Sequence, residues 1–328
     1  MDNIHKTSVD EFVSQILNGN ISYLSKAITL VESSNTKHQE KASLILEKCL
    51  PHANNSIRVG ITGVPGVGKS TFIESFGKHL TNIGKKVAVL AIDPSSNLKK
   101  GSILGDKTRM NTLALDKNAF IRPSPSGDSL GGVAKKTRES ITLCEAAGFN
   151  YIIVETVGVG QSEVTVNSMV DFFLLLKLAN AGDELQGIKR GIIEMADTIV
   201  INKSDGDAIK DTDVAKNEFA RALHLYPMKE NGWLPKVNTC SALYNRGIDE
   251  IYSIIEAFIK HTKANSHFNK KRNQQNKNWF IETINNELKN QFYKNPKVQK
   301  ELNKYFQKIE KLEINPFKAA LEILKNKH

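Results

Sequence analysis

Short apolar runs alternate with amphipathic segments between residue 57 and about residue 262. The runs are rich in Val, Ile and Leu, and the segments between them carry apolar residues at helical spacing. This alternation predicts an α/β domain with a mostly parallel central sheet flanked by helices. The predicted strands are residues 57–62, 86–92, 151–155, 172–178, 198–201 and 236–243.

The flanks of this domain are predicted to be helical. Residues 9–17, 21–31 and 42–50 show helical spacing at the N-terminal side, and residues 279–324 show it at the C-terminal side. Residues 94–132 are predicted to form a long loop, and residues 263–276 a polar linker. We therefore expect three parts: a helical N-terminal extension (1–55), an α/β domain (56–263) and a helical C-terminal arm (264–328).

Composition places the chain among ordinary globular proteins. It has 328 residues, of which 40% are hydrophobic and 24% charged, and its three cysteines are isolated. Unpaired cysteines favour a reducing compartment. The first residues do not form a signal peptide, and we find no apolar run of 18 residues. We expect a cytoplasmic protein without a membrane partner.

Positive charge is concentrated near the C-terminus. The whole chain carries +10, and residues 264–328 contain 14 Lys and Arg against 6 Asp and Glu, a net +8. A basic segment can bind nucleic acid or acidic lipid. It can equally be the solvated face of Lys-rich helices. We favour the second interpretation and expect no nucleic-acid partner.

A phosphate-binding loop follows the first predicted strand. The sequence fits G-x-x-x-x-G-K-[ST], where glycines let backbone N–H groups face phosphate oxygens and the lysine reaches the β- and γ-phosphates. The serine begins a helix, where its hydroxyl can bind Mg²⁺ and the helix N-terminus favours anions. The predicted nucleotide-binding residues are Gly63, Val64, Pro65, Gly66, Val67, Gly68, Lys69, Ser70 and Thr71.

Acidic residues after the next strands are candidate metal ligands. Asp93 ends the strand at 86–92, and Asp106 lies in the long loop, where it could equally cap a helix. With Ser70 and Glu155 they make a candidate Mg²⁺ site of inner- and outer-sphere ligands.

An acid-x-x-G pattern follows the strand at 151–155. Glu155 takes the place of the more usual Asp, so a water-mediated metal contact is plausible, and the Gly158 N–H can sense the γ-phosphate. We expect Glu155 and Lys69 to act in catalysis, and Gln161 is a further candidate for orienting the attacking water.

An N-K-x-D pattern after the strand at 198–201 predicts guanine specificity. Asp205 can accept paired hydrogen bonds from guanine N1–H and its 2-amino group, which adenine lacks. The stem of Lys203 can lie over the base, and Asn202 can join this loop to the phosphate loop. A backbone N–H can meet guanine O6 in the later stretch Ser241, Ala242 and Leu243.

The polar, glycine-containing loop 182–191 has two possible roles. It could move with nucleotide state, or it could be an ordinary connection between a strand and a helix. The chain has no obvious arginine finger, so we expect slow turnover by the protein alone. Our hypothesis is that Lys189, or Arg190, supplies the missing cation when a partner orders this loop.

Taken together, these motifs resemble the methylmalonyl-CoA mutase-associated GTPases, the ArgK-type family. The resemblance covers residues 40–262 closely, and the combination of E-T-V-G-V-G-Q at 155–161 with G-D-E-L-Q-G-I-K at 182–189 is specific to it. It implies slow hydrolysis of GTP with Mg²⁺, a homodimer joined through the C-terminal arm, and loop 182–190 as a third switch. It also implies a chaperone that gates adenosylcobalamin loading into a cobalamin-dependent acyl-CoA mutase and protects that enzyme. Asn180 and Arg190 depart from the family pattern, which has Gly and Lys there.

Other functions remain open at this point. A metallochaperone GTPase for nickel enzymes has the same fold, but the scattered histidines and isolated cysteines speak against a metal-delivery site. A scaffold that nucleotide merely stabilises, or an older transport-associated kinase interpretation, is also compatible with the motifs.

Overall fold

The computed structural model describes residues 7–92, 110–123, 130–156, 158, 162–179 and 190–325. The chain divides into two compact units, Met1–Asn273 and Gln274–His328. Among the helices in the described ranges, none combines the length and the apolar character needed to cross a membrane.

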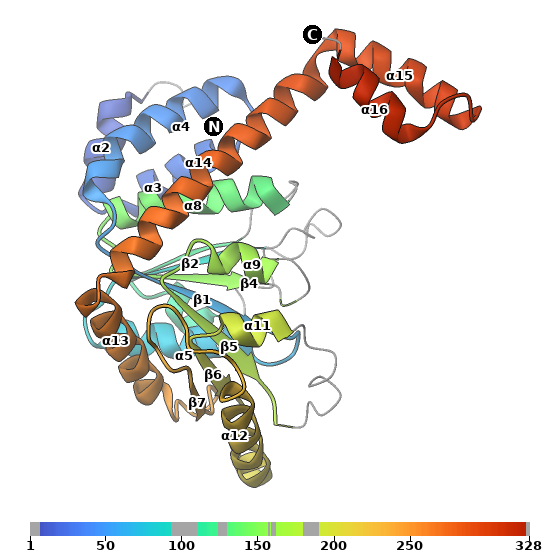
Figure 1. Ribbon diagram of the computed structural model, residues 1–328. Coiled ribbons are helices and arrows are strands. Elements are labelled where there is room, and N and C mark those ends of the chain that lie inside the picture. Colours follow the sequence, from blue (N-terminus) through green and yellow to red (C-terminus); the bar gives the residue numbers. More distant parts are fainter. Residues whose placement is uncertain are drawn as a thin grey trace. The chain divides into compact units, whose positions relative to one another are not determined.

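A seven-stranded sheet forms the centre of the first unit (Figure 1). Every pairing between its strands is parallel, so the predicted α/β fold with a parallel sheet is confirmed. From edge to edge the strands are β3 (Ala119–Arg122), β2 (Val87–Ile92), β4 (Tyr151–Thr156), β1 (Ile57–Gly63), β5 (Phe172–Lys177), β6 (Thr198–Ile201) and β7 (Lys236–Thr239).

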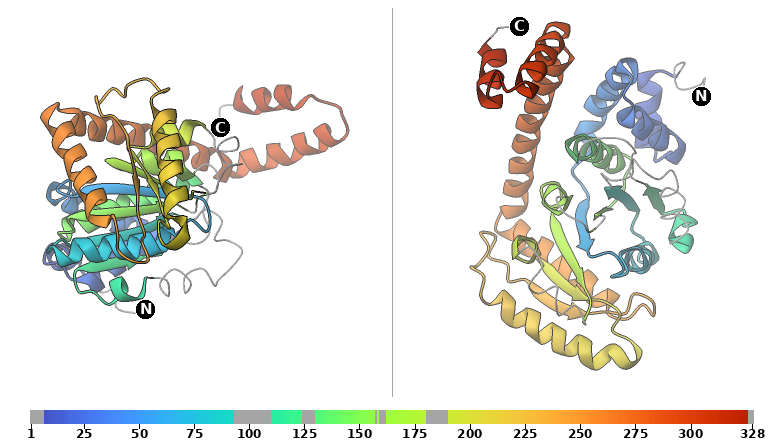
Figure 2. Two further views of the ribbon diagram at one scale, coloured as in Figure 1. Left: turned by 90° about the horizontal axis from the view of Figure 1, so that it is seen from below. Right: turned by 90° about the vertical axis from the view of Figure 1, so that its right-hand side faces the viewer.

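The central strands are buried on both faces. All six residues of β4 and all six of β5 are buried, as expected for a parallel sheet covered by helices on both sides. Side chains alternate between two hydrophobic cores: Ile152 belongs to one, and Tyr151 and Ile153 belong to the other. A helix layer is therefore needed on each face, and Figure 2 shows both layers.

The first face is covered by the N-terminal helices together with two helices of the central domain (Figure 1). The gap between the helices predicted at 9–17 and 21–31 contains a cap, because the side chain of Asn20 accepts hydrogen bonds from the backbone N–H groups of Ser22 and Tyr23. The helices on this face are α2 (Val9–Leu17), α3 (Ile21–Glu32), α4 (Thr36–Cys49), α8 (Leu130–Ala146) and α9 (Ser162–Asn167).

The opposite face is covered mainly by α5 (Lys69–Asn82) and α13 (Ile248–Ala264). Aromatic side chains fill this core: Phe72 stacks with Phe76, and Phe172 of β5 meets Phe258 edge to face. A third core lies under the β5–β7 edge, where α11 (Arg190–Met195) and α12 (Ile209–Leu223) pack. The helices packed on both faces hold the carboxyl ends of the strands in place, and the candidate nucleotide-binding loops begin at these ends.

Two expectations about irregular segments were wrong. The predicted loop 94–132 contains the short helix α7 (Asn111–Ala114) and the edge strand β3, which pairs with β2. The predicted linker 263–276 is also mostly helix, because α14 (His267–Lys294) begins directly after a turn at Ser266. Arg272 on this helix donates to Asp171 in a buried ion pair, so tertiary contacts hold the polar segment in place.

The second unit consists, in its described part, of the remainder of α14 with α15 (Pro296–Glu310) and α16 (Pro316–Lys325). Both prolines stand at the first helical position, which proline favours. The helices α15 and α16 pack together, and the Tyr305 hydroxyl donates to Glu322 across them at 2.8 Å. Large apolar side chains remain exposed on these helices and on the turn between α15 and α16, among them Phe280, Leu288, Phe306, Leu312, Phe317 and Leu324.

Candidate nucleotide-binding site

The phosphate loop connects the end of β1 to the start of α5. Gly63 ends the strand, Lys69 begins the helix, and Ser70 and Thr71 lie in the first helical turn. The N-cap is Gly68 with φ of 93°, and a Cβ there would lie 2.7 Å from Asn202 Nδ2. A side chain at this position would therefore be strained and would push Asn202 away. The intervening residues are Val64, Pro65, Gly66 and Val67.

The ammonium group of Lys69 lies against the loop. Its Nζ donates to the carbonyl oxygens of Gly63 at 2.8 Å and Val64 at 3.3 Å. Burial lowers the pKa of Lys69, while the nearby carboxylates of Glu155 and Glu163 oppose that shift. A desolvated cation in this position is suited to bind phosphate oxygens strongly, because little water screens it.

Gly158 packs directly against the phosphate loop. Its φ is 82°, and a Cβ at this position would lie 1.9 Å from the Gly63 carbonyl oxygen and 2.9 Å from Lys69 Nζ. No side chain fits there without moving the loop backbone. The acid-x-x-G segment and the phosphate loop therefore meet, as a γ-phosphate sensor would require.

Glu155 lies one residue before the end of β4, beside the strand that leads into the phosphate loop. In the sheet it stands opposite Ile61 of β1 and Ala91 of β2, and it is 9% exposed. The next residue, Thr156, donates its hydroxyl to Thr62 at 2.8 Å and ties the two strand ends together. The carboxylate is thus held at the edge of the sheet where Ser70 also lies.

Asn202 connects the phosphate loop with two other segments. Its Nδ2 donates to the Val67 carbonyl oxygen at 2.9 Å. Its Oδ1 accepts from the Ala242 backbone N–H at 3.2 Å and from the Cys240 thiol at 3.3 Å. Asn202 is 2% exposed. All of its contacts are therefore internal, and they fix the mutual positions of three loops at the carboxyl edge of the sheet.

The base-recognition candidates lie on the same edge. Lys203 has φ of 61° and donates from Nζ to the Gly66 carbonyl oxygen at 2.9 Å, across the phosphate loop. The carboxylate of Asp205 accepts a hydrogen bond from the Ser241 hydroxyl. Ser241 is in turn held by backbone hydrogen bonds in both directions with Arg246. Asp205 is thereby oriented next to the Ser241–Ala242 turn.

Leu243 follows this turn and is 67% exposed. It is the weakest candidate among the predicted nucleotide contacts, since most of its side chain is exposed. The turn itself is anchored farther on, where Ser75 of α5 donates its hydroxyl to the Asn245 side chain.

Two residues that support this site were not singled out from the sequence. Glu163, in the first turn of α9, is 2% exposed and its charge acts on Lys69. Cys240 donates its thiol to Asn202, and burial raises the pKa of Cys240 to about 12, so it is a structural thiol. An acid in the first turn of a helix after a glycine-rich loop was the available signal for Glu163.

Four predicted residues lie outside the described residues: Asp93, Asp106, Gln161 and Lys189. Arg190 begins α11, but its side chain is likewise not described. Within the described ranges, no three His, Cys, Asp or Glu side chains gather as a metal-binding cluster. The metal ligands predicted from the sequence therefore stay predictions.

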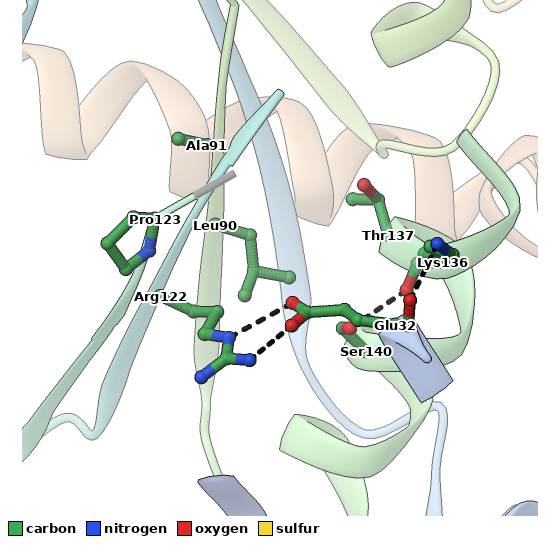
Figure 3. Close-up of a pocket in the computed structure, with 8 residues that line it drawn as sticks. All are labelled: Glu32, Leu90, Ala91, Arg122, Pro123, Lys136, Thr137 and Ser140. Atoms are coloured by element: carbon green, nitrogen blue, oxygen red, sulfur yellow. Dashed lines mark hydrogen bonds and ion pairs between the residues drawn. The ribbon is translucent and has the colours of Figure 1, made fainter. Parts of the chain in front are cut away.

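A small hollow near the edge strand serves a structural purpose (Figure 3). The Glu32 carboxylate at the end of α3 faces the Arg122 guanidinium of β3 and accepts hydrogen bonds from it. Lys136 of α8 donates to the Glu32 carbonyl oxygen at 2.7 Å. The hollow has a volume of about 10 Å³, which is roughly the space of one water molecule. It is a clamp between the N-terminal helices and the sheet, not a ligand site.

Comparison with known proteins identifies close relatives. Residues 24–297 match the family described as "Methylmalonyl Co-A mutase-associated GTPase MeaB". A "Probable GTPase" of Mycobacterium tuberculosis is 46% identical over 317 residues, covering 97% of this chain and 94% of the relative. "GTPase ArgK" of Escherichia coli is 47% identical over 292 residues, covering 89% of this chain and 88% of the relative.

A solved structure extends the likeness to three dimensions. The crystal structure of an "LAO/AO transport system kinase" superposes with a TM-score of 0.77 at 38% sequence identity. The match covers 97% of this chain and 96% of the other.

Proposed function

Because the chain is a GTPase that belongs to the MeaB family of methylmalonyl-CoA mutase-associated GTPases, we propose that it acts as a chaperone for a cobalamin-dependent acyl-CoA mutase. GTP binding and hydrolysis would gate the loading of adenosylcobalamin and protect the mutase. The observation that carries this proposal is the junction made by Asn202, which joins the phosphate loop to the segments bearing Asp205 and Ala242. Because Asn202 connects the candidate phosphate site to the candidate guanine site, a change at one can be transmitted to the other, as a nucleotide-dependent switch requires.

The described residues divide the work of binding and hydrolysis. Lys69 would bind the β- and γ-phosphates, exchanging its hydrogen bonds to loop carbonyls for phosphate oxygens. Asp205 would accept from guanine N1–H and the 2-amino group, and the Ala242 region would donate to O6. Gly158, pressed against Gly63, would respond to the γ-phosphate. Hydrolysis then depends on positioning and charge neutralisation more than on covalent chemistry.

The residues near Lys69 also fit a magnesium ion. Ser70 offers a hydroxyl in the first turn of α5, and Glu155 offers a buried carboxylate at the end of the neighbouring strand. Oxygen donors of this kind are what Mg²⁺ prefers. When bound, the ion would neutralise charge on the phosphate oxygens. Asp93 and Asp106 complete the proposed ligand set.

The response to the partner is proposed to depend on Lys189 or Arg190, at the junction between loop 182–191 and α11. Once the mutase orders the loop, the positively charged side chain of Lys189, or of Arg190, would contact the γ-phosphate during hydrolysis. Gln161 would orient the attacking water. Replacing Lys189 with Ala should then bring the mutase-stimulated rate down to the basal rate. Stimulation that survives in this variant contradicts the role given to Lys189 and leaves Arg190 as the candidate, which Arg190→Ala tests in the same way.

A homodimer joined through the C-terminal arm is part of the proposal. Exposed apolar side chains on α15 and α16, such as Phe306 and Phe317, support it, because such surfaces are commonly covered in an assembly. Sedimentation of the full chain against a Phe306→Glu, Phe317→Glu variant tests this part. A dimer that persists in the variant contradicts a joint at these helices.

The deciding experiment measures phosphate release from GTP and from ATP, with and without a cobalamin-dependent acyl-CoA mutase. We expect slow turnover of GTP alone and acceleration by the mutase. GTP turnover that no mutase changes would leave the nucleotide site intact but remove the chaperone function. Preference for ATP would refute the role given to Asp205.

A further inference from the structure

A second cleft lies at the amino ends of strands β6 and β7. Its volume is about 600 Å³, within the range of small-molecule sites. It is bounded by the end of α11, by the connection from α12 to β7 and by the first turns of α14. The phosphate loop leaves the carboxyl end of β1 in this parallel sheet, so this cleft belongs to the opposite edge.

The described charged residues around the floor of the cleft leave one cation without an ion-pair partner. Asp197 forms an ion pair with Lys229 at 2.8 Å, and Asp171 forms one with Arg272. Lys271 also lines the cleft, and its Nζ donates to the Asp171 carbonyl oxygen at 2.9 Å. Among the described residues, no carboxylate lies within ion-pair distance of Lys271. An ammonium group has three N–H donors, so two of them remain for another acceptor.

Burial of the Lys271 ammonium group disfavours its charged form, because no described carboxylate pairs with it directly. Desolvation lowers the pKa of Lys271, whereas the carboxylates of Asp197 and Asp171 oppose the shift. Asp197 does not neutralise Lys271, because its carboxylate is already paired with Lys229. Lys229 also donates to the carbonyl oxygens of Met195 and Ala196. An anion bound next to Lys271 would remove the imbalance.

The wall of the cleft is apolar and partly aromatic. Trp233 is 8% exposed, and its indole N–H donates to the Asp197 carbonyl oxygen at 2.9 Å, which fixes the ring. Tyr226, Met195 and Leu234 complete the wall. Flat or aliphatic groups bind well to such surfaces. Two exposed acids, Glu194 and Glu230, also line the cleft. The feature that favours an amphipathic acid is therefore local: the ammonium group of Lys271 beside an apolar wall.

We propose that this cleft binds a small organic anion, with its carboxylate or phosphate group on Lys271 and its apolar body against Trp233. The inference does not depend on the mutase partner or on GTP turnover. Its ligand also contacts helices on both sides of the cleft, since Asn167 ends α9 and Met195 ends α11.

Trp233 offers a direct probe of binding. The chain has two tryptophans, so in a Trp279→Phe protein the fluorescence reports on the cleft alone. The full chain, saturated with GDP to fill the nucleotide site, is titrated with phenylacetate, with phenyl phosphate and with uncharged phenylacetamide. We expect either anion to change the fluorescence saturably and to bind at least about tenfold more tightly than the amide, as a charge-assisted hydrogen bond provides. The two anions distinguish a carboxylate from a phosphate ligand.

Matched variants assign the effect to one side chain. Lys271→Met should weaken anion binding at least about tenfold, and Lys271→Arg should retain it. Lys270→Met is the control, because the neighbouring Lys270 is 75% exposed and does not line the cleft. Urea unfolding of each variant verifies that it is folded. Equal binding of anion and amide, unchanged binding by Lys271→Met, or no saturable signal with any probe would overturn the proposal.

Discussion

Replacing Asn202 with Ala should destabilise the first unit and weaken nucleotide binding together. The substitution leaves the Val67 carbonyl oxygen and the Ala242 N–H without the hydrogen-bond partner they have now, in a region where Asn202 is only 2% exposed. A buried polar group that loses its partner costs about 1–3 kcal/mol. For two such groups we expect a loss of about 2–5 kcal/mol in the free energy of unfolding.

The assay is urea unfolding of nucleotide-free protein, followed by titration with GDP and GTP. Nucleotide is omitted in the first measurement because a bound ligand adds its own stability. We expect both affinities to fall by at least about tenfold, since the loops that bind phosphate and base lose their connection. Both nucleotides should be affected alike, because the contacts of Asn202 are with Val67, Cys240 and Ala242 and serve both nucleotides equally.

Two further variants separate the causes. Asn202→Asp keeps the shape and the acceptors for Ala242 and Cys240, but places a carboxylate against the Val67 carbonyl oxygen, so it should also destabilise. Cys240→Ala removes only the thiol contact and should cost less than Asn202→Ala. An Asn202→Ala protein within about 0.5 kcal/mol of the unchanged protein, with normal GTP affinity, would refute the reasoning, because that range is typical of surface substitutions.

Three other substitutions test the remaining assignments. Gly158→Ala should lower GTP hydrolysis by at least about a hundredfold, because a Cβ there would press on the Gly63 carbonyl oxygen and displace the phosphate loop. GDP affinity should fall by less than the hydrolysis rate, and single-turnover phosphate release measures the loss. Asp205→Asn should exchange preference from GTP to xanthosine triphosphate, because an amide N–H can donate to the xanthine 2-oxo group; competition binding measures the ratio. Arg272→Met should cost about 3–5 kcal/mol at neutral pH by leaving Asp171 buried without its partner. Burial raises the pKa of Asp171, but hydrogen bonds and charge from Arg272 outweigh it and lower that pKa below its usual value. The stability from this pair is therefore present above the unfolded pKa and lost as pH falls through the folded one, so the difference between the two proteins should shrink below about pH 4 in urea unfolding.

Each of these three predictions can be contradicted by a specific result. Normal hydrolysis by Gly158→Ala would separate Gly158 from the γ-phosphate, and urea unfolding verifies that the variant is folded. Unchanged GTP preference in Asp205→Asn would remove the base contact from Asp205. A stability difference for Arg272→Met that is constant down to pH 2 would show that Asp171 does not carry the effect.

The strands and the phosphate loop could be predicted because their signals are local. A β-branched run followed by glycines and Lys69 needs no distant residue to be interpreted, and the alternation of runs predicted the parallel sheet. Strand β3 was missed because it is four residues long, lies at the sheet edge and buries only Phe120 fully. An edge strand of that kind depends on its neighbour β2, which the sequence pattern does not specify.

The start of α14 was missed for a different reason. Residues 267–273 are polar and lack an apolar stripe, so composition indicated a linker. In the structure Phe268 is buried and Arg272 donates to Asp171, a residue about a hundred positions away in sequence. Glu163 and Cys240 escaped notice similarly, because their importance comes from spatial neighbours, Lys69 and Asn202.

The position of an acid relative to a strand separates structural carboxylates from the candidate functional ones in this protein. Asp171 precedes β5 and accepts from the Arg58 backbone N–H, and Asp197 precedes β6 and accepts from the Phe173 N–H. These acids connect strand beginnings across the sheet and are matched by Arg272 and Lys229.

Acids near or just beyond the carboxyl ends of strands lie at the opposite edge of the sheet. All strands of a parallel sheet have their carboxyl ends at this edge, and ligands usually bind there. Glu155 and Asp205 belong to this group, and both lie beside the phosphate loop or the loop joined to it. The amino edge should by this argument be purely structural, with every charge matched internally. Lys271 is a cation at that edge that no described carboxylate matches, and this departure is the reason to look for a ligand there.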